Sequence, residues 1–301
     1  MTVHGLHVLD YTAPWPSVRP RAVRLWDCGV TWRHLHLAPD VIDWAPLDRA
    51  VDVARANGAT DLLYVIGATP QWAARDPHAP HAAPWLGAGS NSPPASPGPF
   101  TSFVAALASR YAGRIGTYQV WNEPQLQDFW AGDMTTLADL TRRAARIIRD
   151  RDSRARIASA PVLPRPSSGG MKRGSKYLTA LGKAGWPIDI HTAHLYPEIG
   201  TGAQRWRWML DEWADGLRSV KAPHLPRWVT ETNMNLLGGP LPDPTALLSV
   251  TRIGRIAQAR GIARVYWYAW AHSDPTLLGV PFTPTSVGTR ALTRLTHTQE
   301  A

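Results

Sequence analysis

Two glutamates, Glu123 and Glu231, each follow a run of residues with the character of a β-strand. Residues 117–121 alternate and include aromatic side chains, and Pro124 follows Glu123, where it cannot donate to a continuing strand ladder. Residues 227–230 form a similar run before Glu231. A pair of carboxyl groups at the ends of strands is what cleavage of a glycosidic bond requires, provided that the fold brings the pair together.

Cleavage with retention of configuration gives the two carboxyl groups different tasks. One protonates the leaving oxygen and the other attacks the anomeric carbon, with the groups about 5–5.5 Å apart. The first glutamate to ionise raises the pKa of the other, so one of them stays protonated near neutrality. We expect Asn122, directly before Glu123, to bind the sugar 2-hydroxyl, a contact that strengthens as positive charge develops on the sugar.

Short apolar runs alternate with helical patterns from one end of the chain to the other. The predicted strands are residues 3–9, 22–26, 62–66, 117–121, 156–160, 188–194, 228–231 and 264–270. The predicted helices are residues 47–57, 100–111, 137–149, 177–184, 205–220 and 246–260, with a last one from about residue 289. Eight strands that alternate with helical segments predict an α/β fold with parallel strands joined by crossovers.

At 301 residues, the leading architecture is a single-domain (β/α)8 TIM barrel covering residues 1–301, with its active site at the C-terminal ends of the strands. A doubly wound open sheet is the alternative, but it would usually show a glycine-rich phosphate turn after the first strand. Residues 10–15 (DYTAPW) contain no such turn. The barrel is therefore our prediction, and it places Glu123 after the fourth strand and Glu231 after the seventh.

Two predicted connections are longer than plain turns, residues 76–99 and residues 161–176. Both run from a strand to a helix, so in a barrel both belong to the face that holds the active site. Long loops on that face shape clefts more often than they form mere surface insertions. We therefore expect the two connections to be walls of a cleft.

The composition limits the classes of partner. The chain carries a formal net charge of +9, which favours nucleic acid, anionic lipid or anionic polysaccharide. The basic residues are scattered over predicted helices without a recognition motif, so we expect no nucleic-acid partner. Fifteen tryptophans suit the flat apolar platforms on which sugar rings lie. A carbohydrate partner, either neutral or acidic, fits both observations. We also expect the protein to be a monomer.

Other features exclude simpler alternatives. No run of about 18 apolar residues predicts a membrane span, and residues 1–6 lack the regions of a signal peptide. The single Cys28 excludes an internal disulfide and a multi-cysteine metal site. His34 and His36 lack the helical spacing of zinc enzymes, and no Gly-x-Ser-x-Gly elbow is present. We expect neither a metal nor a cofactor.

The residues around the two glutamates resemble a known group of enzymes. Trp121-Asn122-Glu123-Pro124, followed by Glu231 at the end of a seventh strand, is similar to the clan A glycoside hydrolases, which are retaining (β/α)8 enzymes. The supporting segments are residues 24–32 (RLWDCGVTW), Trp44, Leu47, Asp48 and residues 69–72 (TPQW). With these segments the chain resembles glycoside hydrolase family 39 and its bacterial exopolysaccharide-hydrolase relatives, from about residue 3 to residue 270.

The resemblance implies roles for several residues. Glu123 would be the acid/base and Glu231 the nucleophile. His194 and Tyr196 match positions that orient the nucleophile and contact the sugar, and Arg24 matches an arginine that the clan often keeps near the nucleophile.

Further substrate-binding positions follow from the same resemblance, some with a second interpretation. Trp270, at the end of the eighth strand, matches the platform under the sugar. Asp27 is either a ligand for substrate hydroxyls or a partner for Arg24, and Trp72 either contacts substrate or belongs to the core. Trp267 and Tyr268 are expected to pack within the barrel.

The sequence thus predicts a retaining glycoside hydrolase that needs no cofactor. The long loops and many tryptophans favour endo action on a cell-surface or extracellular polysaccharide, and polymer hydrolysis favours an extracellular location, with a cytoplasmic one left open. An exo-acting, β-xylosidase-like enzyme and a transglycosylase stay open as alternatives. A catalytically silent carbohydrate-binding barrel is the alternative from another class, although its usual signature is the loss of one carboxylate.

Overall fold

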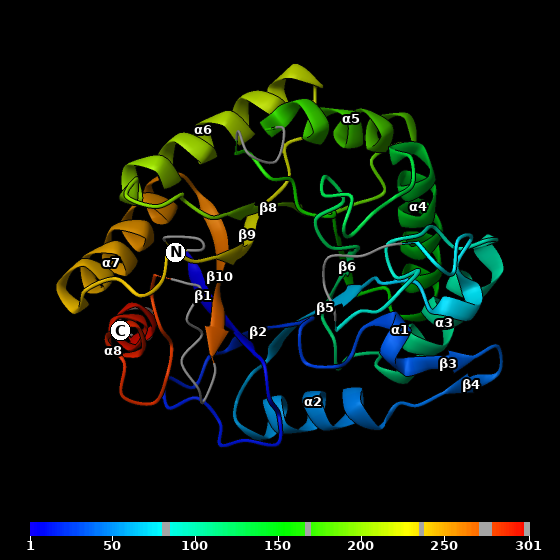
Figure 1. Ribbon diagram of the computed structural model, residues 1–301, viewed down its shortest axis with the longest axis horizontal. Coiled ribbons are helices and arrows are strands. Elements are labelled where there is room, and N and C mark those ends of the chain that lie inside the picture. Colours follow the sequence, from blue (N-terminus) through cyan, green and yellow to red (C-terminus); the bar gives the residue numbers. More distant parts are fainter. Residues whose placement is uncertain (80–84, 166–169, 235–237, 271–278, 298–301) are drawn as a thin grey trace.

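The computed structural model describes residues 1–79, 85–165, 170–234, 238–270 and 279–297. Within them, eight parallel strands form a barrel and helices surround it as an outer ring (Figure 1). The barrel strands are β1 (Val3–Val8), β2 (Ala22–Leu25), β5 (Asp61–Ile66), β6 (Thr117–Val120), β7 (Arg156–Ala158), β8 (His191–Leu195), β9 (Arg227–Thr232) and β10 (Ile262–Trp270). The predicted (β/α)8 barrel is confirmed.

The barrel closes between β7 and β8. The hydrogen-bonded strand order is β7-β6-β5-β2-β1-β10-β9-β8. Between the first and last strands of that order, single parallel bridges pair Ala158 with Ile190 and Val162 with Ala193. Closure leaves β6 and β9, which carry the two glutamates at their ends, separated by only β7 and β8.

The helices occupy the positions that the sequence predicts, and small elements are added near the first crossover. The helices of the ring are α2 (Ala45–Ala56), α3 (Pro97–Arg110), α4 (Met134–Arg151), α5 (Gly170–Lys183), α6 (Gly202–Ser219), α7 (Asp243–Ala259) and α8 (Val287–His297). The additions are α1 (Trp32–Leu35), the hairpin of β3 (His36–Ala38) and β4 (Val41–Ile42), and the 3-10 turn η1 (Gln71–Ala73). None of the described helices is both long and apolar enough to cross a membrane.

Burial patterns explain why these segments adopt these elements. Residues 62–66 of β5 are buried on both faces, as expected for a strand between the barrel interior and the helices. In α4, Leu137, Ala144 and Ile148 face the core at helical spacing, and Asp133 caps the first turn by accepting a hydrogen bond from the Thr136 backbone N–H.

The largest difference from the predicted boundaries is at α5. α5 begins at Gly170, whereas the sequence predicts a helix only from Tyr177 and a loop up to residue 176. The extra turns contain two glycines and several basic residues. The basic side chains are exposed, so these turns lack the apolar residues at helical spacing that would predict a helix. The connection after β7 is therefore shorter than expected, and its residues 166–169 lie outside the described part of the chain.

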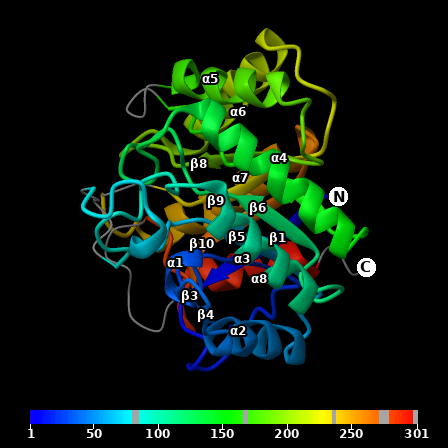
Figure 2. The same ribbon diagram turned by 90° about the vertical axis from the view of Figure 1, so that its right-hand side faces the viewer.

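The connection after β5 lies at the C-terminal ends of the strands. In Figure 2 its cyan trace is on the left, opposite the two chain ends on the right. Backbone bonds from Arg75 to Pro93 and from Ala95 to Ala73 draw its two ends together. Asn91 bonds the backbone of Gln127 and Ala131, in the segment that follows Glu123. Its described residues therefore border the segment that follows Glu123, and residues 80–84 lie outside the description.

Candidate active site

Glu123 sits on a backbone turn that L-residues rarely adopt. β6 ends at Val120, and Trp121 and Glu123 then have φ angles of 78° and 39°. Left-handed conformations are costly for residues other than glycine and concentrate at functional sites, where the surrounding structure enforces them. The turn leaves both Asn122 and Glu123 buried, at 2% and 7% exposure.

Irregularities in strand register accompany Glu231. β8 pairs Ala193 with Val229 but the next residue, His194, with Glu231, so β9 has one extra residue at this point. Bulges re-aim side chains and are common beside active sites. This one brings His194 and Glu231 level with each other at the mouth of the barrel.

The fold brings the two glutamates together. One carboxylate oxygen of Glu123, one of Glu231 and a ring nitrogen of His194 all lie within 4.8 Å of one another. Retaining glycosidases hold their carboxyl groups about 5–5.5 Å apart, whereas inverting enzymes leave about 6.5–9.5 Å for a water. The spacing here is of the retaining kind.

Two donors hold the carboxylate of Glu231. Nη1 of Arg24 donates to Oε2 at 2.9 Å, and the hydroxyl of Tyr196 donates to Oε1 at 2.6 Å. Burial raises the pKa of Tyr196 well above its usual range, so the phenol stays a donor. Donors on both oxygens fix the orientation of the Glu231 carboxylate.

Arg24 is fully buried and is itself held in place. Its Nε donates to Oε1 of Gln119 at 3.0 Å, and its Nη2 donates to Oδ1 of Asn122 at 2.7 Å. Gln119 in turn donates to the backbone of Ser159 and the hydroxyl of Thr192. Since Asn122 accepts through Oδ1, and no hydrogen bond among the described residues uses its Nδ2, that amide group is free to meet a sugar hydroxyl.

Glu123 has the environment of a proton donor. Burial raises its pKa, against the opposing charges of Arg165 and Arg24. Its Oε1 lies 2.7 Å from Nδ1 of His194, which is the spacing of an ion pair. Burial, however, lowers the pKa of His194 to about 3, so the imidazole is neutral at ordinary pH and the contact is a hydrogen bond.

His194 therefore contacts the predicted acid/base more closely than the predicted nucleophile. Its Nδ1 is 3.7 Å from Oε2 of Glu231, a full ångström beyond its distance to Glu123. The resemblance implies that His194 orients Glu231. In the structure, however, the short contacts to Glu231 come from Tyr196 and Arg24.

A third carboxyl group, Asp27, borders the pair. One oxygen each from Asp27 and Glu231 lie within 4.8 Å of each other and of a ring nitrogen of His7. Burial first, and the charge of Glu231 second, raise the pKa of Asp27 to about 8, and the hydroxyl of Tyr268 hydrogen-bonds it. Asp27 thus faces Glu231 and does not serve only as a partner for Arg24.

The two tryptophans with predicted roles differ in their surroundings. Trp270 is 2% exposed and ends β10, next to Val8 of β1. Trp72 donates to the backbone of His36 at 2.8 Å and packs against its ring, so its contacts belong to the β3–β4 hairpin. Trp267, expected to pack within the barrel, is fully buried against Phe282 and His4, whereas Tyr268, expected to pack there too, hydrogen-bonds Asp27 in the site.

The cluster of Glu123, His194 and Glu231 also has the spacing of a three-ligand metal site. Its donor set is a poor fit for a cation, because the guanidinium of Arg24 already bonds Glu231 and would repel a second positive charge. Tyr196 occupies the other oxygen of Glu231. Carboxyl groups held in this way suit proton and nucleophile chemistry.

Three further residues of the site were not predicted from the sequence. Gln119 positions Arg24, Arg165 acts on Glu123, and His7, whose Nε2 lies 3.0 Å from the Thr230 backbone oxygen, borders Asp27. For Gln119 and His7 a signal was available, since each is a polar residue in the middle of an apolar strand.

Comparisons with known proteins place the fold. No protein-family model matches the chain, and a search of curated proteins finds no match. Among solved structures, a monomeric β-xylosidase from Caulobacter crescentus is similar at 18% identity and TM-score 0.70, over 92% of this chain and 62% of that one. A GH39 enzyme from Xanthomonas axonopodis pv. citri matches at 18% identity and TM-score 0.71, over 98% and 70%.

A more distant match has the same architecture. The endo-β-1,4-mannanase from Thermotoga petrophila is 12% identical, with TM-score 0.65 over 99% of this chain and 76% of that one. At these identities the likeness establishes the fold, and the resemblance to the clan A barrels, family 39 included, is confirmed at that level. The chain spans 62% of the length of the Caulobacter β-xylosidase and 70% of that of the Xanthomonas GH39 enzyme.

Proposed function

We propose that the chain is a retaining glycoside hydrolase in which Glu231 is the nucleophile and Glu123 the acid/base. The observation that carries this proposal is the close pair of carboxyl groups with opposite surroundings. Glu231 receives hydrogen bonds from Arg24 and Tyr196, one on each carboxylate oxygen, whereas burial raises the pKa of Glu123 and favours its neutral form.

In the first step Glu231 attacks the anomeric carbon while the bond to the leaving oxygen breaks. The carboxyl group of Glu123 gives its proton to that oxygen, so the leaving sugar departs as a neutral alcohol. The step ends with the sugar bound covalently to Glu231 and with Glu123 ionised.

In the second step Glu123 accepts a proton from water as the water attacks the anomeric carbon. The sugar is released, and Glu231 regains its charge. His194 supports both steps in the tautomer that carries its proton on Nδ1, because the neutral imidazole then donates to Oε1 of Glu123 and leaves the other oxygen to give or take the transferred proton. The two inversions give overall retention.

Other residues around the pair would bind the reacting sugar. The free Nδ2 of Asn122 suits the 2-hydroxyl, and Asp27 with Tyr268 offers further polar groups beside Glu231. Trp270, buried at the end of β10, is the residue predicted to form the platform under the ring. A protonated Asp27 would donate as well as accept, which widens the range of hydroxyls it can bind.

The substrate is part of the proposal. Structures with this fold include enzymes named β-xylosidase, xylanase and endo-β-1,4-mannanase, which supports a polysaccharide or its fragments. We propose endo action, because the described part of the loop after β5 borders the segment following Glu123 and would lengthen a cleft. An extracellular polysaccharide as the substrate and a monomeric enzyme complete the proposal.

Product analysis tests the function and the mode of action together. Wild-type protein and the Glu231→Ala variant are incubated with neutral and acidic polysaccharides and with aryl glycosides, and the products are identified by mass spectrometry. Oligosaccharides that form with the wild type and not with the variant establish endo hydrolysis.

The other outcomes separate the alternatives. Monosaccharide released only from aryl glycosides indicates an exo-acting glycosidase, and products longer than the substrate indicate a transglycosylase. Binding of polysaccharide without any product contradicts the proposal and indicates a silent carbohydrate-binding barrel.

A further inference from the structure

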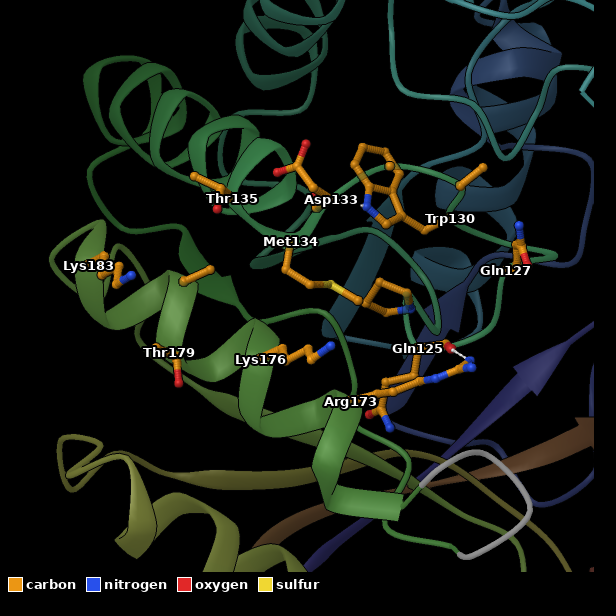
Figure 3. Close-up of a pocket in the computed structure, with 14 residues that line it drawn as sticks. Gln125, Gln127, Trp130, Asp133, Met134, Thr135, Arg173, Lys176, Thr179 and Lys183 are labelled. Carbon is orange, nitrogen blue, oxygen red and sulfur yellow. Dashed lines mark hydrogen bonds between the residues drawn. The ribbon is translucent and has the colours of Figure 1, made fainter.

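A hollow lies beside the segment that follows Glu123. It has a volume of about 520 Å³ and separates the start of α4 from α5 (Figure 3). Pro124 and Gln125, the two residues after Glu123, line it on one side, and residues of α5 line it on another. The hollow therefore shares a backbone segment with the predicted acid/base.

The α5 wall of this hollow is basic. Arg173, Lys176 and Lys183 line it, at spacings of three and seven residues that put all three on one helical face. The opposite face of α5, with Tyr177 and Leu181, is buried in the core. From Arg173 to Lys183 the helix rises about 15 Å, so the charges form a stripe and not a point.

The positive charge of the stripe is not neutralised. α5 contains no acidic residue, and among the ion pairs of the described residues none involves Arg173, Lys176 or Lys183. The one carboxylate in the lining, Asp133, is engaged as the cap of α4, where it accepts from the backbone and the hydroxyl of Thr136. In Figure 3 the amine of Lys176 points into the space between the two helices.

Hydrogen bonds tie the basic stripe to the catalytic segment. Nη1 of Arg173 donates to the backbone oxygen of Gln125 at 2.9 Å. The side chain of Gln125 donates to the Gly170 oxygen at 2.9 Å and accepts from the Leu163 backbone at 2.6 Å. Arg165, in the same connection, acts electrostatically on Glu123, so positive charge extends from the hollow to the acid/base.

We propose that this hollow binds the acidic groups of sugar units on the leaving-group side of the cleaved bond. The proposal rests on the proposed function, because the leaving oxygen must lie on the side of the residue that protonates it. A stripe of several ammonium and guanidinium groups suits a polymer with repeated carboxylates or sulfates, since each unit can meet its own cation. Neutral glycans gain nothing from the stripe.

Binding to a silenced protein tests the site without turnover. In a Glu231→Gln background, titration calorimetry measures affinity for oligosaccharides of polygalacturonate and alginate, which carry carboxylates, of chondroitin sulfate, which also carries sulfates, and of neutral xylan and mannan. The Lys176→Glu/Lys183→Glu double variant is compared with Lys172→Glu. Lys172 lies on the same helix and is exposed, but it does not line the hollow.

Acidic oligosaccharides of at least one class are expected to bind more tightly than the neutral ones, and more weakly as salt is added. The double variant should lose about tenfold of that affinity, the size expected when exposed charge contacts are removed and reversed. Lys172→Glu should stay within about twofold of the parent. A preference for carboxylate or for sulfate identifies the acidic group.

Three outcomes overturn the inference. They are an unchanged affinity in the double variant, an equal loss in Lys172→Glu, and tighter binding of a DNA duplex than of any glycan with the same dependence on Lys176 and Lys183. None of these bears on catalysis, which depends on Glu231. Conversely, turnover that survives in Glu231→Ala contradicts the proposed function, but the affinity measurement still tests binding at the hollow.

Discussion

The guanidinium of Arg24 lies 2.9 Å from Oε2 of Glu231 and has no exposed side-chain surface. It also donates to Gln119 and Asn122, so one buried cation links the predicted nucleophile to the residue that precedes the acid/base. A buried charge needs partners on several sides, and here the partners are the residues of the site. Catalytic geometry and stability of the barrel interior are therefore coupled at Arg24.

Replacing Arg24 by lysine keeps the charge and removes the fork that serves three acceptors at once. We expect kcat to fall about 100-fold, as misplacement by about 1 Å does in positioned sites, and the melting temperature to fall as well. The exposed Arg21→Lys on the same segment is the control and should change neither quantity. An unchanged kcat in Arg24→Lys would show that the guanidinium does not position Glu231.

Removing the hydroxyl of Tyr196 deletes one of the two donors to Glu231. A hydrogen bond to a charged group contributes about 1.5–3 kcal/mol, so Tyr196→Phe should lower kcat/KM about 10- to 100-fold. Tyr118→Phe is the matched control, because the Tyr118 hydroxyl is buried without a hydrogen-bond partner among the described residues. Similar losses in both variants would point to a general effect of the phenols on folding.

Glu123→Gln removes the proton donor and leaves the shape of the site. Substrates with poor leaving groups should lose about 100- to 10,000-fold in kcat/KM, because they need the proton, whereas activated aryl glycosides should lose far less. Glu198→Gln serves as the control, since that carboxylate pairs with Arg205. Equal losses across leaving groups would assign Glu123 a different role.

The charge of Arg165 opposes the raised pKa of Glu123. Glu123 must be protonated for the first step, so kcat/KM should decline as pH rises through its pKa. Without the positive charge the ionised form is less favoured, so Arg165→Gln should move this decline to higher pH, by about half a unit. Arg205→Gln should leave the profile in place, and a shift toward lower pH in Arg165→Gln would contradict the electrostatic reasoning.

His4 gives the fold a dependence on acid that is separate from catalysis. It lies buried at the start of β1 beside Trp267, and burial lowers its pKa from the usual 6.5 to about 4. Between these values the unfolded chain binds the extra proton, so stability is present above pH 6.5 and is lost as the pH falls toward 4. The loss attributable to this group is about 3 kcal/mol.

Thermal melts between pH 4 and pH 7 test this dependence. His4→Gln should melt with a shallower dependence on pH than the wild type, whereas the exposed His224→Gln should follow the wild type. Identical slopes in all three proteins would show that His4 is protonated in the folded state or that other groups dominate the acid response.

The alternation of apolar runs and helical patterns was enough to predict the barrel, because each strand buried on both faces and each one-sided helix has its own local signature. Elements with few residues had no such signature, and the β3–β4 hairpin was therefore not predicted. The start of α5 was missed because its first turns face solvent or the hollow and carry charge in place of apolar residues.

For the candidate site, the residue types at strand ends were sufficient to single out Glu123 and Glu231, but not their surroundings. A one-residue bulge in β9 pairs His194 with Glu231 at the barrel mouth, where His194 also contacts Glu123. The pattern of apolar residues in the sequence does not show where such a bulge lies. Gln119 and Arg165 act through space on partners far away in the sequence. The basic face of α5 was visible as spacing, but its position beside the segment after Glu123 required the fold.

Chemical rescue of the nucleophile variant is the most direct measurement. In Glu231→Ala, hydrolysis of an activated aryl glycoside should fall to the background rate, and added azide should restore cleavage by filling the space of the missing carboxylate. NMR of the product should show a glycosyl azide of inverted configuration, since only one displacement occurs. Hydrolysis at the wild-type rate without azide would contradict the role of Glu231 and, with it, the double-displacement mechanism.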